Sequence, residues 1–469
     1  MLHMLVRPAL AYIGRHKYLR SPRLAALLFW ASLRRIGGPR APNGGRYVAL
    51  FLSRPGLTED VMSVLADAPH FSMLAAPQGI FKALARGFLP GTIDEQNYAN
   101  LSPEEEASKR TYRAFLQRML SYLLRFCRID IIISGNFAYF AEREMHAAAE
   151  ALGLPFVILH KENLKSPART AYFENLYRSR RGPFSGRRII VYNSTERDIQ
   201  IAAGIVSAER ISVCGMPRLD RIHAWRRAAA KAGLPDRPCI LFFTFGTKTG
   251  LPGLRRKMEV PGLQRKAYGK FTEPLEPGLD SLSWEQTARL TMQAVARFAD
   301  ANPHVRVIMK SKRGYVQREE FRAAAGHMPP NVEWIDGGDP LPLLKDAWAV
   351  VGMNSSAVLE ALAMGKIVLT PGYAEAGTPT MQPWLADFGP AVERMQTPEQ
   401  LVARLSEVCT AKPPEVPAEL GRAAIEALEQ WAGNSDGKAS ERVRVVIERE
   451  VATLPRCIPV GSVTRAFPT

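Results

Sequence analysis

Short apolar runs alternate with longer helical patterns along most of this 469-residue chain, and they form two series. Several runs place β-branched residues on consecutive positions, as strands buried on both faces of a parallel sheet do. The break Pro235-Asp236-Arg237-Pro238 separates the series. The runs are 47–52, 129–133, 156–159, 188–192 and 211–213, then 239–244, 305–309, 332–335, 349–351 and 367–370. We therefore expect an α/β fold with two Rossmann-like parallel-sheet domains.

The chain is too long for one ordinary hydrophobic core, so we expect several units. Clusters of glycine and proline set the expected boundaries. We expect a basic amphipathic helical segment over 1–45 and an N-terminal Rossmann-like domain over 46–235. A C-terminal Rossmann-like domain is expected over 236–410, and helices with a tail over 411–469. Five scattered cysteines without a CxxC pair favour a reducing, cytoplasmic compartment and no structural metal.

The formal net charge of +17 implies an anionic partner. Between Met1 and Arg40 there are eight Lys or Arg residues and no acidic residue. Such a segment can lie on an anionic membrane surface, but its apolar stretch over 24–33 is shorter than the roughly 20 residues that span a bilayer. Packing of the two helices on the protein itself is the alternative. No zinc, RRM or KH signature is present, so we expect no nucleic-acid partner.

The segment 348–371 indicates a strand, a turn at Gly352, and a helix that begins near Ser356 and stops at Gly365. Free backbone amides at such a helix start bind anions and suit a diphosphate. We expect the candidate donor-binding side chains to lie at this helix start. They are Asn354, Ser355 and Ser356, with Glu360 one turn deeper, where its carboxylate would accept both hydroxyl protons of a ribose.

Helix capping is the alternative interpretation of the same residues, with Ser356 as the cap and Glu360 favouring the helix N-terminus. A capping box requires the acid three residues after the cap, and that position is Leu359. Ligands of open α/β sheets lie beyond the carboxyl ends of the strands. We therefore favour ligand contact over capping.

Two motifs carry a resemblance to known families. The run GMNSSAVLEALAMGKIV over 352–368 resembles the donor-binding signature of glycosyltransferases with the two-lobed GT-B fold. Upstream, Tyr192-Asn193-Ser194 and then GMPRLD over 215–220 resemble the G-x-P-R-x-D segment of the CDP-glycerol glycerophosphotransferase-like and capsule polysaccharide transferase families. The resemblance implies two lobes that face each other across a cleft, with a nucleotide donor on the C-terminal lobe, an acceptor on the N-terminal lobe and no obligatory metal or other cofactor.

The sequence has no Asp-x-Asp triplet to hold a divalent cation, so protein groups must neutralise the leaving group. The candidates follow the first two strands of the second series: the loop with Gly246, Thr247 and Lys248, and Lys310. The loop lacks the P-loop spacing. For Arg218 we expect either proximity to the donor phosphate or a structural salt bridge with Asp220.

On the acceptor side, His160, Lys161 and Glu162 follow the carboxyl end of a strand. An attacking hydroxyl needs a proton acceptor, and His160 or Glu162 would serve. The alternative is a loop histidine without a catalytic role, with Glu162 paired to Lys161 or Lys165. Ser134 and Asn136 occupy the equivalent loop of the preceding strand and are expected to line the acceptor pocket.

These expectations describe a metal-independent glycosyltransferase that moves a sugar from a nucleotide-activated donor to a surface-polysaccharide or lipid-linked acceptor. Nothing in the sequence selects the base. A CDP-polyol phosphotransferase, a nucleotide-sugar epimerase and a non-catalytic nucleotide-binding scaffold remain as alternatives.

Overall fold

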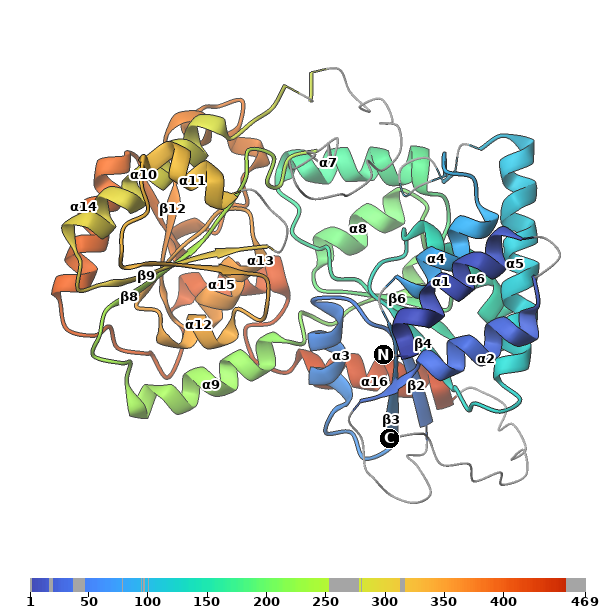
Figure 1. Cartoon of the computed structure of the whole chain (residues 1–469). Coiled ribbons are helices and arrows are strands. Elements are labelled where there is room, and N and C mark those ends of the chain that lie inside the picture. The colour runs from blue at the N-terminus through green and yellow to red at the C-terminus, as the bar shows by residue number, and fades with distance from the viewer. Residues whose placement is uncertain are drawn as a thin grey trace.

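The computed structural model describes most of the chain. Figure 1 shows two α/β halves joined by helices. The expected tail after 452 and the end of the expected N-terminal segment, 37–45, lie outside the described residues. The described residues are 2–16, 20–36, 47–77, 79–93, 95, 98–99, 101–252, 278–279, 281–312 and 317–452.

The first sheet contains seven described strands in the order β1-β3-β2-β4-β5-β6-β7. All neighbours are parallel except the edge pair β1 and β3. Every expected run of the first series forms a strand, whereas the edge strand β1 and the buried strand β3 were not expected. The strands are β1 (Arg34–Arg35), β2 (Tyr47–Leu52), β3 (Phe71–Ala76), β4 (Ile131–Ser134), β5 (Phe156–Leu159), β6 (Arg188–Val191) and β7 (Ile211–Val213).

The second sheet contains six described strands, all parallel, in the order β10-β9-β8-β11-β12-β13. Numbered along the chain, this is the order 3-2-1-4-5-6 of a Rossmann fold. The prediction of two Rossmann-like parallel sheets is therefore confirmed. The strands are β8 (Cys239–Phe243), β9 (Arg306–Ser311), β10 (Val332–Asp336), β11 (Ala349–Val351), β12 (Ile367–Pro371) and β13 (Glu393–Met395).

Helices cover both faces of the first sheet, which is why its strands are apolar on consecutive positions. One face packs against α3 (Leu57–Leu65) and α16 (Ala439–Ala452), so the last described helix returns to the first half (Figure 1). The helices of the other face are α4 (Ile80–Phe88), α5 (Pro103–Leu123), α6 (Phe140–Glu150) and α8 (Ser194–Ala202).

The second sheet is covered in the same way. Helix α7 (Pro167–Leu176) touches both halves: Tyr172 packs against the core of the second sheet, and Phe173 against that of the first. One face of the second sheet carries α10 (Glu285–Ala301), α11 (Gln317–Ala325) and α14 (Pro398–Thr410). The other carries α9 (Leu219–Ala232), α12 (Leu341–Asp346), α13 (Ser356–Ala363) and α15 (Arg422–Ala432).

The N-terminal segment forms two helices, α1 (Leu2–Arg15) and α2 (Pro22–Ser32), which pack on the first half. A Cβ on Gly87 of α4 would lie 2.4 Å from the Cα of Gly14, so paired glycines let α1 and α4 approach closely. Packing on the protein's own body, one of the two expected alternatives, accounts for the buried apolar residues of these helices. Those residues are Val6, Leu10, Ile13, Ala25, Ala26 and Phe29.

Some apolar side chains of α1 and α2 are not buried against the rest of the protein. Leu5, Tyr12, Leu24 and Leu27 stay exposed. None of the helices among the described residues combines the length and the apolar character that crossing a bilayer requires.

Candidate functional site

Each sheet has a point beside which the strand order reverses. In the first sheet the chain leaves β2 for β3 on one side and continues with β4 on the other, and in the second sheet β8 lies between β9 and β11 in the same way. Open α/β sheets bind ligands beyond the carboxyl ends of the strands at such points. Expected site residues lie at the ends of these strands on both halves: Ser134 ends β4 and Asn136 follows it, the loop 246–248 follows β8, and Asn354, Ser355 and Ser356 follow β11.

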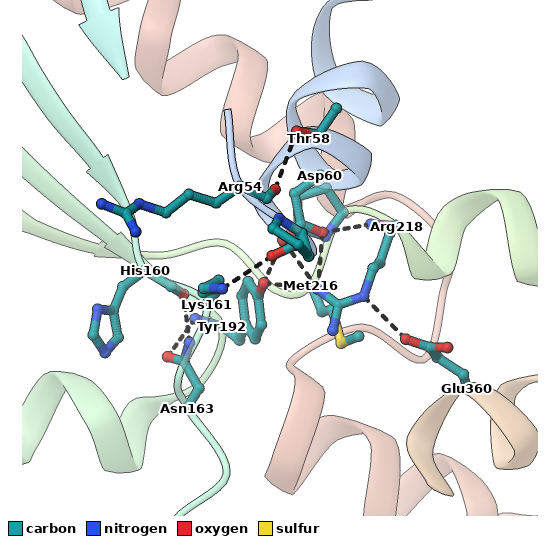
Figure 2. A network of polar contacts seen from close by, with 12 residues as sticks. Arg54, Thr58, Asp60, His160, Lys161, Asn163, Tyr192, Met216, Arg218 and Glu360 are labelled. Atoms are coloured by element: carbon teal, nitrogen blue, oxygen red, sulfur yellow. Dashed lines mark hydrogen bonds and ion pairs between the residues drawn. The ribbon is translucent and has the colours of Figure 1, made fainter. Parts of the chain in front are cut away.

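Arg218 joins the two halves at this place (Figure 2). Its Nε donates to Oε1 of Glu360 on α13 at 3.0 Å. Its Nη1 donates to both carboxylate oxygens of Asp60 on α3, at 3.2 and 3.1 Å, and lies 3.0 Å from the hydroxyl of Tyr192. The Tyr192 hydroxyl in turn donates to Asp60. One guanidinium therefore holds a carboxylate from each half.

All four side chains of this Arg218 cluster are buried. Burial raises the pKa of both Asp60 and Glu360, and the charge of Arg218 offsets that effect only in part. Burial alone would lower the pKa of Arg218, but Asp60, Tyr192 and Glu360 hold it well above its ordinary value. The guanidinium thus stays charged, and two carboxylates compete for it.

The start of α13 agrees with the expected helix, but its cap is Ser355 rather than Ser356. The Ser355 hydroxyl accepts from the Ala357 amide at 3.3 Å. Asn354 has a positive φ of 49°, and its side chain bonds to the backbone at Trp384 and Ala386, at 3.1 and 2.8 Å. Ser355 and Ser356 are half-buried. This helix end is therefore reached by solvent, while Asn354 shapes the turn and Glu360 lies on Arg218.

The other expected donor-side groups are held by local contacts in the second half. Gly246 donates its amide to the Thr249 hydroxyl at 2.9 Å, and the Thr247 carbonyl accepts from the Trp284 amide at 2.8 Å. The Lys248 ammonium bonds to a carbonyl oxygen in the segment before α10. Lys310 is buried, which lowers its pKa, and donates to the carbonyl of Ser311 at 2.9 Å. The expectation that Lys310 follows its strand is wrong: β9 runs on to Ser311, and Lys310 lies within it, paired with Phe243 of β8.

His160 is fully buried, with 0% of its side chain exposed. Its Nε2 lies 3.1 Å from Glu196 Oε1, and the Lys165 ammonium lies 3.5 Å from Glu196 Oε2. Burial alone would raise the pKa of Glu196, but Lys165 and His160 outweigh it and hold that pKa at about 2. Figure 2 shows the His160 ring turned away from the Arg218 cluster. The burial of this ring against Glu196 favours the alternative of a loop histidine without a direct catalytic role.

Lys165, one of the two lysines expected to pair with Glu162, forms its ion pair with Glu196 instead. Its ammonium also donates to the Glu162 backbone carbonyl. Glu162 itself is exposed. Lys161 is half-buried, and its ammonium donates to the Pro55 carbonyl at 2.9 Å. Burial lowers the pKa of Lys161; the charge of Glu162 opposes this effect, and the Arg54 and Arg218 charges add to it.

Ser134, the last residue of β4, and Asn136, two residues further on, are both buried. The Ser134 hydroxyl donates to Glu142, which also pairs with Arg54, and the Arg54 guanidinium lies 3.8 Å from the centre of the Tyr139 ring. The Asn136 Oδ1 accepts from the Ala138 amide at 2.8 Å. The first sheet thus brings Ser134, Lys161 and the unexpected Arg54 to the carboxyl ends of β2, β4 and β5.

The two charged residues of the G-x-P-R-x-D segment, Arg218 and Asp220, contact different parts of the protein. The alternative of an Arg218–Asp220 salt bridge is wrong: Asp220 accepts from the amides of Ala439 and Ser440 at 3.1 and 2.7 Å, at the start of α16. Residues two apart at a helix start point in different directions, so Arg218 and Asp220 serve different partners. Gly215 has a φ of 87°, and a Cβ there would lie 2.2 Å from the Gly433 carbonyl oxygen. The motif therefore anchors the returning C-terminal helices.

Sequence reasoning missed Asp60, Arg54 and Glu196 as parts of these networks. Asp60 follows Glu59 in the first turn of α3, where acidic residues are ordinary, so no local signal distinguishes it. The same holds for Glu196 in the first turn of α8. Within the ranges that the structure describes, we find no group of three His, Cys, Asp or Glu side chains arranged to hold a metal ion.

No protein-family model matches this chain, and no curated protein matches it in sequence. Solved structures match most of its length. A putative UDP-N-acetylglucosamine 2-epimerase from Listeria monocytogenes is 13% identical, with a TM-score of 0.49, over 88% of this chain and 98% of that chain. The wall teichoic acid polymerase TagF is 10% identical, with a TM-score of 0.46, over 96% of this chain and 98% of that chain. The glycotransferase of kitacinnamycin is 14% identical, with a TM-score of 0.43, over 88% of this chain and 100% of that chain. At these identities and TM-scores the likenesses identify neither a family nor a substrate for this chain.

Proposed function

We propose that this protein is a glycosyltransferase that binds a nucleotide-activated sugar donor where the carboxyl ends of the two sheets meet. The observation that carries the proposal is the junction itself: Arg218 follows β7 of the first sheet and pairs with Glu360 of α13, which follows β11 at the reversal point of the second. Ligands of open α/β sheets bind at such points. A guanidinium, a helix N-terminus and a buried carboxylate supply the groups that a nucleoside diphosphate requires.

On the donor side, the diphosphate would lie at the amides of Ser355 and Ser356, and the ribose hydroxyls would donate to Glu360. Arg218 would neutralise the leaving diphosphate, which agrees with a sequence that has no Asp-x-Asp triplet for a metal. Lys310 lies near the carboxyl end of β9, and the loop 246–248 follows the neighbouring strand β8; together they complete the proposed donor side. Asn354 would act through the turn that it holds.

On the acceptor side, Glu162 is the proposed proton acceptor, because it is an exposed carboxylate beside Lys161 at the carboxyl end of β5. His160 would hold the loop 160–163 in place through its buried contact with Glu196. Ser134 and Asn136 would shape the pocket floor for a glycan or lipid-linked acceptor. The protein removes the hydroxyl proton, the acceptor oxygen bonds to the anomeric carbon, and the bond from that carbon to the nucleotide breaks.

An anionic membrane surface is a proposed partner, and a specific observation supports it. Helices α1 and α2 expose Leu5, Tyr12, Leu24 and Leu27 between basic residues, and positions 2–36 contain no Asp or Glu. Apolar side chains among cations suit the boundary between acyl chains and anionic headgroups. Binding there would bring the first half close to a lipid-linked acceptor on the cytoplasmic face.

The reaction products distinguish the alternatives. The experiment incubates the protein with UDP-, GDP-, CMP- and CDP-linked donors, with and without a membrane extract as acceptor, and measures the released nucleotide. A sugar transferase releases UDP, GDP or CDP from a diphosphate-linked donor, or CMP from a CMP-linked one, only when acceptor is present. A CDP-polyol phosphotransferase releases CMP from the CDP-polyol. An epimerase changes the donor sugar without acceptor, and a scaffold binds without turnover. Any of these last three results would contradict the proposed sugar transfer.

A further inference from the structure

The contacts of Arg218 are shared unequally between the two halves. The first half supplies Asp60, which accepts from Nη1 and from the Arg218 backbone amide, and Tyr192, whose hydroxyl lies 3.0 Å from Nη1. The second half supplies one hydrogen bond, from Nε to Glu360. The attachment to Glu360 is therefore the one that can be exchanged with the least loss of contacts.

The partners of Arg218 in the first half are themselves held in place. The Asp60 carboxylate is fully buried in the first turn of α3, where the helix dipole favours a negative charge. It accepts from the Tyr192 hydroxyl as well as from Arg218. The Tyr192 backbone amide donates to Asn163 Oδ1 at 3.0 Å. Arg218 thus rests on a rigid polar support that belongs to the first half (Figure 2).

The charges of the cluster permit an exchange. One guanidinium faces two buried carboxylates, so Arg218 keeps a counter-charge in Asp60 when Glu360 is withdrawn. A withdrawn Glu360 needs new donors, because a buried carboxylate without partners is unfavourable. The two hydroxyls of a ribose are such donors. The Nε side of Arg218 is then free for an anion that arrives with the same ligand.

We propose that Asp60 and Tyr192 are positioning residues, which keep Arg218 on the first half while its Nε side exchanges Glu360 for the diphosphate of the donor. This inference rests on the proposed function, because it requires a nucleotide at the junction of the sheets. It goes further by predicting an exchange of ion-pair partners on binding. It also assigns a role to two residues that would touch Arg218 and no part of the ligand.

The test separates the contribution of the diphosphate from that of the nucleoside. Isothermal titration gives the Kd of cytidine and CDP, of uridine and UDP, and of guanosine and GDP. The ratio of the nucleoside Kd to the diphosphate Kd measures the diphosphate contribution. In Asp60→Asn we expect this ratio to fall by roughly tenfold, as for a lost charged hydrogen bond. Tyr192→Phe should lower it by roughly threefold, a smaller loss because this variant keeps the ion pair between Arg218 and Asp60.

Glu360→Gln provides the reciprocal result. It should raise the nucleoside Kd, because the ribose loses its carboxylate, while the diphosphate ratio stays equal to that of the wild type or increases. A purely structural role for Asp60 would weaken nucleoside and diphosphate binding by the same factor and leave the ratio unchanged, and that result would overturn the inference. An unchanged ratio in both Asp60→Asn and Tyr192→Phe would also overturn it.

Asp130→Asn is the matched control. Asp130 accepts from the Val48 amide at 2.6 Å at the amino ends of β2 and β4, whereas the proposed site lies at the carboxyl ends, so its loss should leave the ratio unchanged. If Asp60→Asn does not fold, Tyr192→Phe still decides the question, because it retains the buried ion pair. A wild-type protein that binds none of the six ligands would overturn the proposed function, and the inference with it. Binding by the wild type with unaltered ratios in the variants overturns the inference alone.

Discussion

The Nε of Arg218 lies 3.0 Å from Oε1 of Glu360, and this ion pair joins the G-x-P-R-x-D segment of the first half to the α13 helix of the second. The two residues are 142 positions apart in the chain. Their pairing means that the carboxylate proposed for the donor ribose already has a partner in the unliganded protein. Donor binding must therefore compete with a contact inside the protein.

Glu196→Gln should destabilise the first half. The substitution leaves the Lys165 ammonium, 1% exposed, without its counter-charge, and breaking a buried pair in this way costs about 3–5 kcal/mol. Urea unfolding followed by circular dichroism measures the change. Glu399→Gln is the matched control, because the Arg297–Glu399 pair is exposed and its loss should leave the midpoint unchanged. Equal effects of the two substitutions would contradict the assignment.

The same carboxylate gives a pH dependence. The pKa of Glu196 is held at about 2 in the folded protein, below its ordinary unfolded value of about 4.3. A depressed folded pKa contributes stability that is fully present above the unfolded pKa and is lost as the pH falls through the folded one. Wild-type stability should therefore decline between about pH 4 and pH 2 more steeply than that of Glu196→Gln. Parallel curves for the two proteins would rule out this contribution.

Gly215→Ala should weaken the attachment of the C-terminal helices. The new Cβ would lie 2.2 Å from the Gly433 carbonyl oxygen, in addition to the cost of a positive φ of about 1–2 kcal/mol. Gly204→Ala is a matched control, since Gly204 also has a positive φ of 70° but nothing lies within 4 Å of its Cβ position. Thermal unfolding should show the larger loss for Gly215→Ala. A larger loss for Gly204→Ala would refute the close approach.

Leu24→Glu with Leu27→Glu should reduce binding to vesicles that contain anionic lipid. The pair removes exposed apolar side chains and adds two negative charges to a helix surface without acidic residues. Co-sedimentation with phosphatidylglycerol vesicles measures the bound fraction. Ile425→Glu, at an exposed position on α15, should leave it unchanged. Wild-type protein that stays in the supernatant would exclude the proposed membrane contact.

The sequence predicted most of the fold because β-branched apolar runs mark strands buried on both faces. It missed β3 (Phe71–Ala76), which is buried but contains no β-branched residue, and the short polar edge strand β13 (Glu393–Met395). Arg218 and Glu360 were both expected near the donor. Their contact was not predictable, because no local pattern brings residues so distant in the chain together.

Other parts of the site depend on long-range contacts in the same way. Asp60 lies 158 positions from Arg218 and looks like an ordinary first-turn acid of a helix. His160 was expected to face the acceptor because it follows a strand, but its ring is buried against Glu196. Position after a strand predicts the edge of the sheet at which a residue lies. It does not predict whether the side chain points outward or into the core.

A thermal-shift panel of UDP-, CDP-, CMP- and GDP-linked donors tests nucleotide binding at the α13 helix most directly. Ligand that binds only the folded state raises Tm by mass action. We predict that at least one donor raises the Tm of the wild type, and that Glu360→Ala, folded but without the carboxylate, loses the shift. A shift of equal size in Glu360→Ala, or no shift with any donor, would contradict the central claim.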